Sequence, residues 1–270
     1  AAHYPTAGGH AQGDAWPAFH EVLVGHEEAV RAGVGRPCQT NEVGRCAALI
    51  WGFLEVAHLT RRPLRLLEVG ASAGLNLRWD HFHYGNGEAR WGDPASPVDL
   101  DGLWDEPPPH LGTPVAIASR QGCDLSPLDP GSAEHRLALQ SSVWADQEAR
   151  FRRLDGALAL AARVAATVDA APLEEWLPQR LAAAAAGTAS VVYHSIVEEY
   201  LPAPRLAGFH ALMEEAGARA TPEAPLAWVR LEPQPGQRRH LLTLQFWPGA
   251  ARRTLAHCGA HGTNVRTFVS

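Results

Sequence analysis

The chain has no lysine and few long basic runs. All 23 basic residues among its 270 are arginines, and 29 acidic residues give a formal net charge of −6. No basic run is longer than two arginines, whereas nucleic-acid binding needs clustered positive charge that displaces counterions. These absences argue against a nucleic-acid partner and favour a small-molecule substrate.

Long apolar segments and paired cysteines are also missing. The most apolar stretch, residues 47–59, contains Glu55 and His58 and is shorter than the ~20 residues that span a bilayer. No basic segment followed by an apolar core opens the sequence. Cys38, Cys46, Cys123 and Cys258 form no CxxC pair and no zinc-like spacing with histidine. We therefore expect reduced thiols, no metal, no membrane segment and a cytoplasmic location.

The remaining pattern alternates between helical and strand-like segments. Helical periodicity covers residues 17–60, 133–166, 173–186 and 204–217, and short apolar strand patterns cover 64–69, 114–119, 189–194, 225–231, 239–247 and 253–258. This order predicts an open α/β sheet, parallel first and antiparallel at its C-terminal edge. We expect an N-terminal helical cap over residues 1–60, then an α/β domain over residues 61–270 with an irregular insertion at about 85–113.

The first strand runs into a glycine loop, Gly70-Ala-Ser-Ala-Gly74. The loop has neither the GKS/T ending of a triphosphate-binding loop nor the GxGxxG spacing of a dinucleotide site. Its letters match GxSxG, the nucleophile elbow of α/β-hydrolases, with Ser72 as the nucleophile. Asp124 or Asp146 and then His194, His257 or His261 could complete that triad. A serine hydrolase is therefore one alternative.

A second interpretation begins at Glu68, because E-x-G-x-x-x-G resembles motif I of class I S-adenosylmethionine-dependent methyltransferases. Residues 122–127, Gly-Cys-Asp-Leu-Ser-Pro, resemble the segment after the second strand of those enzymes, whose acid binds the ribose hydroxyls. Two carboxylate oxygens suit a diol, and ligands of open α/β sheets lie at the carboxyl ends of the strands. About fifty residues separate Gly70 from Asp124, more than in those enzymes.

Over most of its length the sequence resembles a bacterial family of uncharacterised proteins with a methyltransferase-like domain. Four stretches carry this match: Gln39–Arg45, Leu67–Leu77, Arg120–Asp129 and Val143–Gln147. The resemblance implies a Rossmann-like class I methyltransferase fold with S-adenosylmethionine as the cofactor. On this basis the expected cofactor-binding residues are Glu68, Gly70, Ala71, Ser72, Gly74, Asn76, Asp124 and Asp146.

Polar residues outside the loop supply further candidates. Gln39, Asn41, Glu42 and Arg45 form a polar cluster before an apolar helix, and Arg45 could bind a substrate carboxylate as a fork. A helix cap explains part of this cluster without any function. His194 ends a predicted strand, where its pKa would suit proton transfer, although a structural histidine gives the same pattern.

These candidates define the expected site. His194, Glu42 and Arg45 are the catalytic candidates, and Gln39, Asn41, Arg45 and Tyr193 are the substrate-binding candidates. The expected function is that of a methyltransferase-like protein acting on a small molecule. The alternatives are the serine hydrolase and a non-catalytic ligand-binding module of the same fold. The sequence leaves the methyl acceptor and the oligomeric state open.

Overall fold

A computed structural model describes residues 2–35, 39–182 and 185–268. The α-helices are α1 (Trp16–Gly25), α2 (Glu27–Val34), α3 (Cys46–Thr60), α4 (Ala133–Ser141), α5 (Glu148–Ala161), α6 (Leu173–Leu181) and α7 (Ala203–Ala218). The 3₁₀ helices are η1 (Pro5–Ala7), η2 (Val43–Arg45), η3 (Leu75–His81) and η4 (Glu198–Tyr200). The strands are β1 (Leu64–Val69), β2 (His83–Gly85), β3 (Arg90–Trp91), β4 (Asp99–Asp101), β5 (Ile117–Asp124), β6 (Thr167–Ala170), β7 (Ala189–Ser195), β8 (Leu226–Pro233), β9 (His240–Trp247), β10 (Ala250–Cys258) and β11 (Arg266–Thr267).

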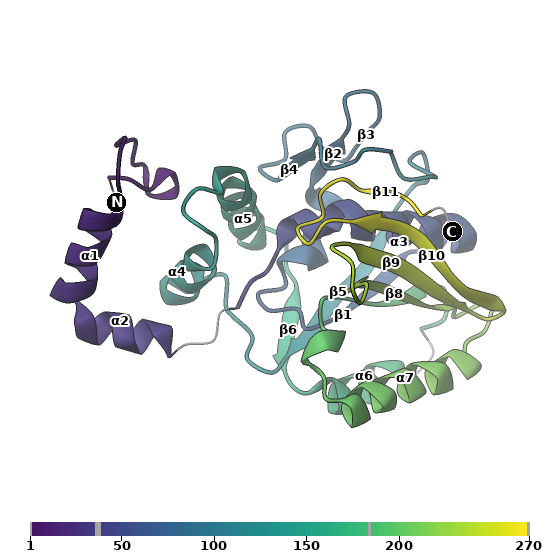
Figure 1. The fold of residues 1–270 in the computed structure, drawn as a ribbon. Helices are drawn as coiled ribbons and strands as arrows, with labels where there is room; N and C mark the ends of the chain where they lie inside the picture. The colour runs from purple at the N-terminus through teal and green to yellow at the C-terminus, as the bar shows by residue number, and fades with distance from the viewer. Residues whose placement is uncertain (1, 36–38, 183–184, 269–270) are drawn as a thin grey trace.

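The large sheet has eight strands in the order β11-β10-β9-β8-β7-β1-β5-β6 (Figure 1). Strands β6, β5, β1, β7 and β8 pair in parallel, and β9 and β10 follow as an antiparallel edge. The predicted fold class is confirmed as an open α/β sheet that is mostly parallel with an antiparallel C-terminal edge. From β1 the chain adds β5 and β6 on one side of that strand, and it then adds β7 and β8 on the other side. The strand order therefore reverses between β1 and β7. A crevice at this reversal, at the carboxyl ends of the strands, is where such folds bind ligands.

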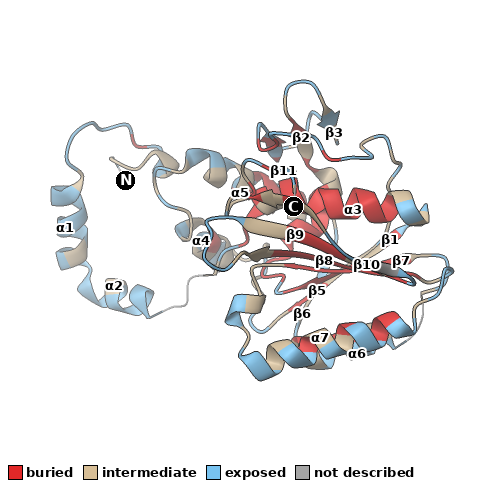
Figure 2. Cartoon of the chain, turned by 45° about the vertical axis from the view of Figure 1, so that its right-hand side comes forward, coloured by how far each residue is buried: buried red, intermediate tan, exposed pale blue. Residues whose placement is uncertain are grey.

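Helices cover both faces of this sheet. On one face, α3 is apolar around most of its circumference and has twelve buried residues among its 15, as expected for a helix enclosed in a core. On the other face, α6 and α7 pack Trp176, Phe209 and Met213 against the sheet. Figure 2 shows the buried strands between these two layers. Since β1 and β7 are buried on both faces, their nearly continuous apolar sequences identified them correctly.

Two elements differ from the sequence-based expectation. The second strand is β5, Ile117–Asp124, and therefore begins three residues later than predicted and continues through polar residues. The helix expected over 133–166 is two helices, α4 and α5, and the chain then enters β6, which the pattern did not indicate. Strand β6 is a short edge strand with no buried residue, so it lacks the apolar run that marks a central strand.

The insertion expected to be irregular contains a second, three-stranded sheet in the order β3-β2-β4. Its aromatic side chains stack: the ring centroids of Trp79 and Trp91 are 5.3 Å apart, and those of Tyr84 and Trp104 are 5.6 Å apart. Trp104 Nε1 also donates to the carbonyl oxygen of Ala47 in α3 at 2.7 Å. The insertion is therefore anchored in the main core, and it accounts for the long spacing between the glycine loop and Asp124.

The N-terminal helices lie apart from the sheet. Neither α1 nor α2 has a buried residue, and both extend away from the rest of the chain (Figure 1). By contrast, α3 packs against β7, β8, β9 and β10; the boundary proposed at residue 60 stays a prediction. Cys38, one of the four cysteines expected to be reduced, lies outside the described residues. Among the residues that are described, no helix has the length and hydropathy needed to cross a membrane.

The contact between α3 and β8 gives a stability prediction. A Cβ added at Gly52 would lie 2.7 Å from Val229 Cγ1, so Gly52→Ala should destabilise the protein by about 1–3 kcal/mol through overpacking. Gly208 in α7 has no atom within 4 Å of an added Cβ, and Gly208→Ala should stabilise by up to about 1 kcal/mol. Urea denaturation measures both changes. Equal effects of the two substitutions would contradict the close packing at Gly52.

Candidate functional site

Residues 39–45, here called the strap, cross the carboxyl ends of three strands. After β5, Gln39 Nε2 donates to the carbonyl oxygen of Ser126 at 3.1 Å. Asn41 Oδ1 accepts a hydrogen bond from the backbone N of Leu75, beyond β1, at 2.9 Å. At the end of β7, Arg45 Nη1 donates to the carbonyl oxygen of Ser195 at 3.3 Å. The polar cluster of the sequence is thus spread along the sheet edge.

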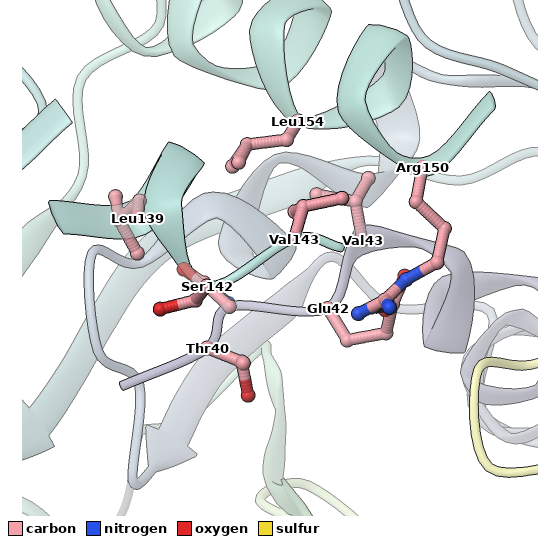
Figure 3. Close-up of a pocket in the computed structure, with 9 residues that line it drawn as sticks. Thr40, Glu42, Val43, Leu139, Ser142, Val143, Arg150 and Leu154 are labelled. Carbon is pink, nitrogen blue, oxygen red and sulfur yellow. Dashed lines mark hydrogen bonds and ion pairs between the residues drawn. The ribbon is translucent and has the colours of Figure 1, made fainter. Parts of the chain in front are cut away.

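A backbone contact and an ion pair fix the strap in place. A Cβ on Gly44 would lie 2.4 Å from the carbonyl oxygen of His261, so only glycine allows this approach. Glu42 accepts hydrogen bonds from the backbone N of Gly44 at 3.1 Å and from Arg150 Nε at 2.7 Å, and His261 Nδ1 lies 3.1 Å from its Oε2. Figure 3 shows Arg150 reaching from α5 towards Glu42.

These partners determine the charge of Glu42. Burial alone would raise the pKa of this carboxyl, but the hydrogen bond with His261 and the positive charge of Arg150 hold it below its ordinary value. Both carboxylate oxygens therefore stabilise the strap. The catalytic role expected for Glu42 stays a prediction, since these partners would have to release it first.

A small cavity lies between the strap and the helices α4 and α5 (Figure 3). Its volume of about 10 Å³ is enough for about one water molecule. The lining residues are Thr40, Asn41, Glu42, Val43, Leu139, Ser142, Val143, Arg150 and Leu154. This cavity belongs to the packing of the strap and is too small for a nucleoside.

The glycine loop depends on left-handed backbone conformations. Gly70, Ser72 and Gly74 have φ values of 67°, 53° and 66°, which glycine adopts readily and serine rarely. Arg78, only 3% exposed, donates from Nη1 to the carbonyl oxygen of Gly74 at 2.7 Å and from Nε to that of Val164 at 2.7 Å. Sequence reasoning missed Arg78, which holds the end of the loop in place.

The two predicted cofactor segments meet at the end of β5. Asp124 Oδ2 accepts a hydrogen bond from the backbone N of Ser72 at 2.9 Å, and Oδ1 accepts one from the backbone N of Ser126 at 2.9 Å. Ala71 donates its backbone N–H to the carbonyl oxygen of Cys123 at 3.0 Å. The carboxylate therefore joins the loop after β1 to the turn after the neighbouring strand.

The other side of the loop is covered by an apolar side chain. A Cβ on Gly70 would lie 2.6 Å from Val197 Cγ2, so Val197 occupies the space that the missing side chain leaves at the crevice between β1 and β7. Ile196, just before it, has a φ of 56°, which is a genuine outlier for a β-branched residue. Such strained residues persist where surrounding contacts hold them, often next to functional sites.

The geometry around Ser72 bears on the hydrolase alternative. Its Oγ is buried and has no hydrogen-bond partner among the described residues, and Asp124 bonds to the backbone N of Ser72 itself. A serine nucleophile needs a base within hydrogen-bond reach. No described side chain bonds to Oγ, so the structure does not assemble the triad that GxSxG suggested with any of the candidate partners Asp124, Asp146, His194, His257 and His261.

Glu68 and Tyr193 lie side by side in β1 and β7. Tyr193, fully buried, donates from its hydroxyl to Glu68 Oε2 at 3.2 Å. Burial raises the pKa of Glu68 to about 8, although the hydrogen bond from Tyr193 and the positive charge of Arg78 oppose this shift. These two predicted site residues therefore form a buried pair beneath the loop, with Glu68 protonated at neutral pH.

His194 has both ring nitrogens occupied. Trp228 Nε1 donates to Nε2 at 3.1 Å, and Nδ1 lies 2.7 Å from Glu232 Oε1. Because an indole N–H can only donate, Nε2 must be the unprotonated nitrogen, and Nδ1–H donates to Glu232. The side chain has 0% exposure. The structure thus places this predicted base in a buried network, where neither nitrogen is free to take a proton.

Sequence reasoning missed Glu232 near the end of β8. Its Oε1 accepts hydrogen bonds from His194 and from the backbone N of Val197 at 3.0 Å, while Oε2 is buried without a partner. Burial raises the pKa of Glu232, but the hydrogen bond from His194 and the backbone N–H groups of Val197 and Glu198 outweigh this effect and hold it below its ordinary value. The signal was present: an acidic residue directly follows the apolar run at 225–231, where parallel strands place functional groups.

Two further predicted cofactor residues lie in different surroundings. Asn76 is buried, and its Nδ2 donates to the carbonyl oxygen of Glu42 at 3.4 Å, so it joins the strap to η3. Asp146 is exposed between α4 and α5, and within the described part of the chain no hydrogen bond connects it with the glycine loop. Asn76 is therefore brought to the loop, and Asp146 is not.

The three cysteine thiols that the structure describes are buried. Cys46, Cys123 and Cys258 are free and buried. Burial raises the pKa of Cys123 and of Cys258 to about 12, so neither is a thiolate at neutral pH. The described part of the chain holds no group of three or more His, Cys, Asp or Glu arranged for a metal ion.

The buried pair of Glu68 and Tyr193 predicts how stability depends on pH. Since the folded pKa of about 8 exceeds the ordinary value of 4.5, the unfolded chain loses this proton at lower pH than the folded one. The free energy of unfolding should therefore fall as the pH rises from about 4.5 to about 8. Glu68→Gln should flatten this slope, whereas Glu21→Gln on the exposed helix α1 should not. Identical pH profiles of Glu68→Gln and the unmodified protein would refute a protonated Glu68.

The unpartnered hydroxyl of Ser72 predicts no hydrolase-type reactivity. A fluorophosphonate probe should not label the native protein, because no base is in place to activate Oγ. Gel fluorescence with a known serine hydrolase as the positive control measures this. Labelling that disappears in Ser72→Ala would show that the nucleophile is active after all.

Two solved structures to which this chain shows similarity are methyltransferases. One is S-adenosylmethionine-bound CalS10, an amino pentose methyltransferase from Micromonospora echinaspora. It is 12% identical to this chain, and the alignment covers 90% of this chain and 78% of that chain with a TM-score of 0.27. The sugar N-methyltransferase KedS8 from Streptoalloteichus sp ATCC 53650 is 13% identical, with 96% and 77% covered and a TM-score of 0.28.

Sequence comparisons complete the assignment. No curated protein matches the chain. A family model described as an uncharacterized protein conserved in bacteria matches residues 1–266. The match covers nearly the whole chain, including the strap, the glycine loop and the strand ends described above. The chain therefore belongs to the bacterial family DUF2332.

Proposed function

We propose that this protein is an S-adenosylmethionine-dependent methyltransferase that acts on a small molecule. One observation carries the proposal: Asp124 at the end of β5 bonds to the backbone of Ser72 in the glycine loop after β1. This pairs an acidic residue with a glycine loop at the carboxyl ends of adjacent parallel strands, where α/β folds bind their ligands. The insertion between β1 and β5 lengthens the connection without separating the two segments.

The residues at this corner fit the cofactor in part. Asp124 is partly exposed, and a carboxylate offers about four acceptor sites. Two backbone N–H groups use two of these sites, and Gln39 Nε2 donates to Oδ1 at 3.5 Å, so a ribose diol would bind in place of Gln39. The loop from Gly70 to Gly74 would hold the methionine portion after Val197 moves off Gly70. When bound, S-adenosylmethionine supplies an electrophilic methyl group.

Glu232 is the best-placed group to take a proton from the acceptor. It is linked to the crevice through Val197, whose side chain covers Gly70 and whose backbone N–H bonds to Oε1. Its second oxygen is unpartnered, and its lowered pKa keeps the carboxylate ionised. His194 then acts as a positioning residue, because its Nδ1–H orients Glu232. Catalysis otherwise rests on holding the acceptor in line with the methyl group.

Calorimetric titration with S-adenosylmethionine and S-adenosylhomocysteine tests this proposal. Asp124→Asn should weaken binding at least about tenfold, because each hydrogen bond to a charged group contributes about 1.5–3 kcal/mol. Val197→Ala should tighten binding by about 3- to 10-fold, because it uncovers Gly70 and favours the open state. The matched control is Val22→Ala on the exposed face of α1.

Asp124→Asn should lower the affinity for the cofactor and Val197→Ala should raise it. A general loss of stability would not produce these opposite changes. Circular dichroism establishes that each variant is folded. Folded protein that binds neither compound, even with Val197→Ala, would overturn the methyltransferase assignment. Binding that is insensitive to both Asp124→Asn and Val197→Ala would place the cofactor elsewhere.

A further inference from the structure

Arg45 is held at the end of β7 by neutral groups. Its Nε donates to the carbonyl oxygen of Ala260 at 3.2 Å, and its Nη1 lies 3.3 Å and 3.4 Å from the carbonyl oxygen and the Oγ of Ser195. All three distances are long for hydrogen bonds to a guanidinium. Nη2 donates no hydrogen bond to any described residue. The side chain is thus positioned but has donors to spare.

Three other arginines near this edge have carboxylate partners. Arg150 pairs with Glu42, Arg230 with Glu198 at 3.2 Å, and Arg120 with Asp80 at 2.7 Å, whereas Arg78 donates to carbonyl oxygens only. Among the described residues no carboxylate lies within 4.0 Å of the Arg45 guanidinium. Burial lowers the pKa of Arg45, and Glu42 and Glu232 oppose this only from a distance. A bound anion would therefore stabilise this partly buried guanidinium, since buried charges are normally paired.

His240 adds a second unsatisfied group at the same sheet edge, since it pairs with Cys258, two residues before the Ala260 that accepts a hydrogen bond from Arg45. Its Nδ1 is buried and has no hydrogen-bond partner among the described residues. Burial lowers the pKa of His240, and the positive charge of Arg45 lowers it further. A neutral imidazole can carry its proton on either nitrogen and can therefore donate to a ligand. Arg45 and His240 thus offer one charged and one neutral donor at the same strand ends.

We propose that Arg45, with His240 beside it, binds the carboxylate of a small-molecule ligand at the end of β7. Ser195, which holds Arg45, is two residues before Val197 at the crevice between β1 and β7, so the ligand lies next to the glycine loop. The identification of this ligand as the methyl acceptor rests on the proposed function. The anion site itself does not depend on it.

The surrounding charges favour a monoanion over a phosphate dianion. Glu42 and Glu232 interact electrostatically with Arg45, and Glu199 and Glu232 interact with His240. These acidic groups offset much of the positive potential that a dianion needs. A guanidinium fork suits the two oxygens of a carboxylate.

NMR titration in the absence of cofactor tests the site. The probe is propionate, with propionamide as its uncharged analogue and inorganic phosphate as the competing anion, all at constant ionic strength. Propionate should saturate and shift the Arg45 Nε–H signal, propionamide should not, and phosphate should bind more weakly. Tighter binding of phosphate, or no saturable binding of propionate, would overturn the carboxylate assignment.

Variants locate the site. Arg45→Gln should weaken propionate binding at least tenfold, while Arg45→Lys, which keeps the charge, should lose less. Arg219→Gln is the matched control, because Arg219 is exposed and pairs with Glu215 within α7. Unchanged binding in folded Arg45→Gln would refute the proposal. If propionate binds through Arg45 but S-adenosylmethionine does not bind, the carboxylate site stands and the methyltransferase proposal fails.

Discussion

The organisation of the carboxyl edge depends on the strap, a short polar segment that crosses three parallel strands. Its side chains and backbone satisfy groups that the strand ends would leave unpaired, among them the backbone N–H of Leu75 and the carbonyl oxygen of Ser126. The ion pair between Glu42 and Arg150 ties it to α5, and the glycine contact at Gly44 sets its distance from the 259–262 turn. Removing one partner from such an interaction is costly to stability, because it leaves a buried charge or donor without a partner.

The strap and the strand ends divide the polar groups into two kinds. Most are committed to holding the structure: His194 to Trp228 and Glu232, and Glu42 to Arg150. Among the described residues a few have capacity to spare, namely the partly exposed Asp124, Glu232 Oε2, His240 Nδ1 and the guanidinium of Arg45. The proposed ligand and proton-transfer sites use these groups, and a catalytic role of His194 stays a prediction.

The strands that define the fold class were predictable where both faces of a strand are buried. The central strands β1 and β7 are buried on both faces and have apolar sequences, and the C-terminal strands alternate with clear turns. The edge strand β6 was not predictable, since a short half-exposed strand has no distinctive pattern. Polar β5 was placed too early for a similar reason: Arg120 within it is satisfied by Asp80, a partner forty residues away that local periodicity cannot reveal.

The sequence alone determined which functional groups are present near the sheet edge. These are the glycine loop after the buried strand β1, Asp124 at the end of β5, and the polar cluster before the apolar helix α3. Only the tertiary structure decided which of these groups are free. Partners far apart in the chain, such as Glu42 with Arg150 and His194 with Glu232, consume donors and acceptors. Whether a side chain can bind a ligand depends on what already fills its hydrogen-bonding capacity, and that follows from strand order and packing, not from spacing along the chain.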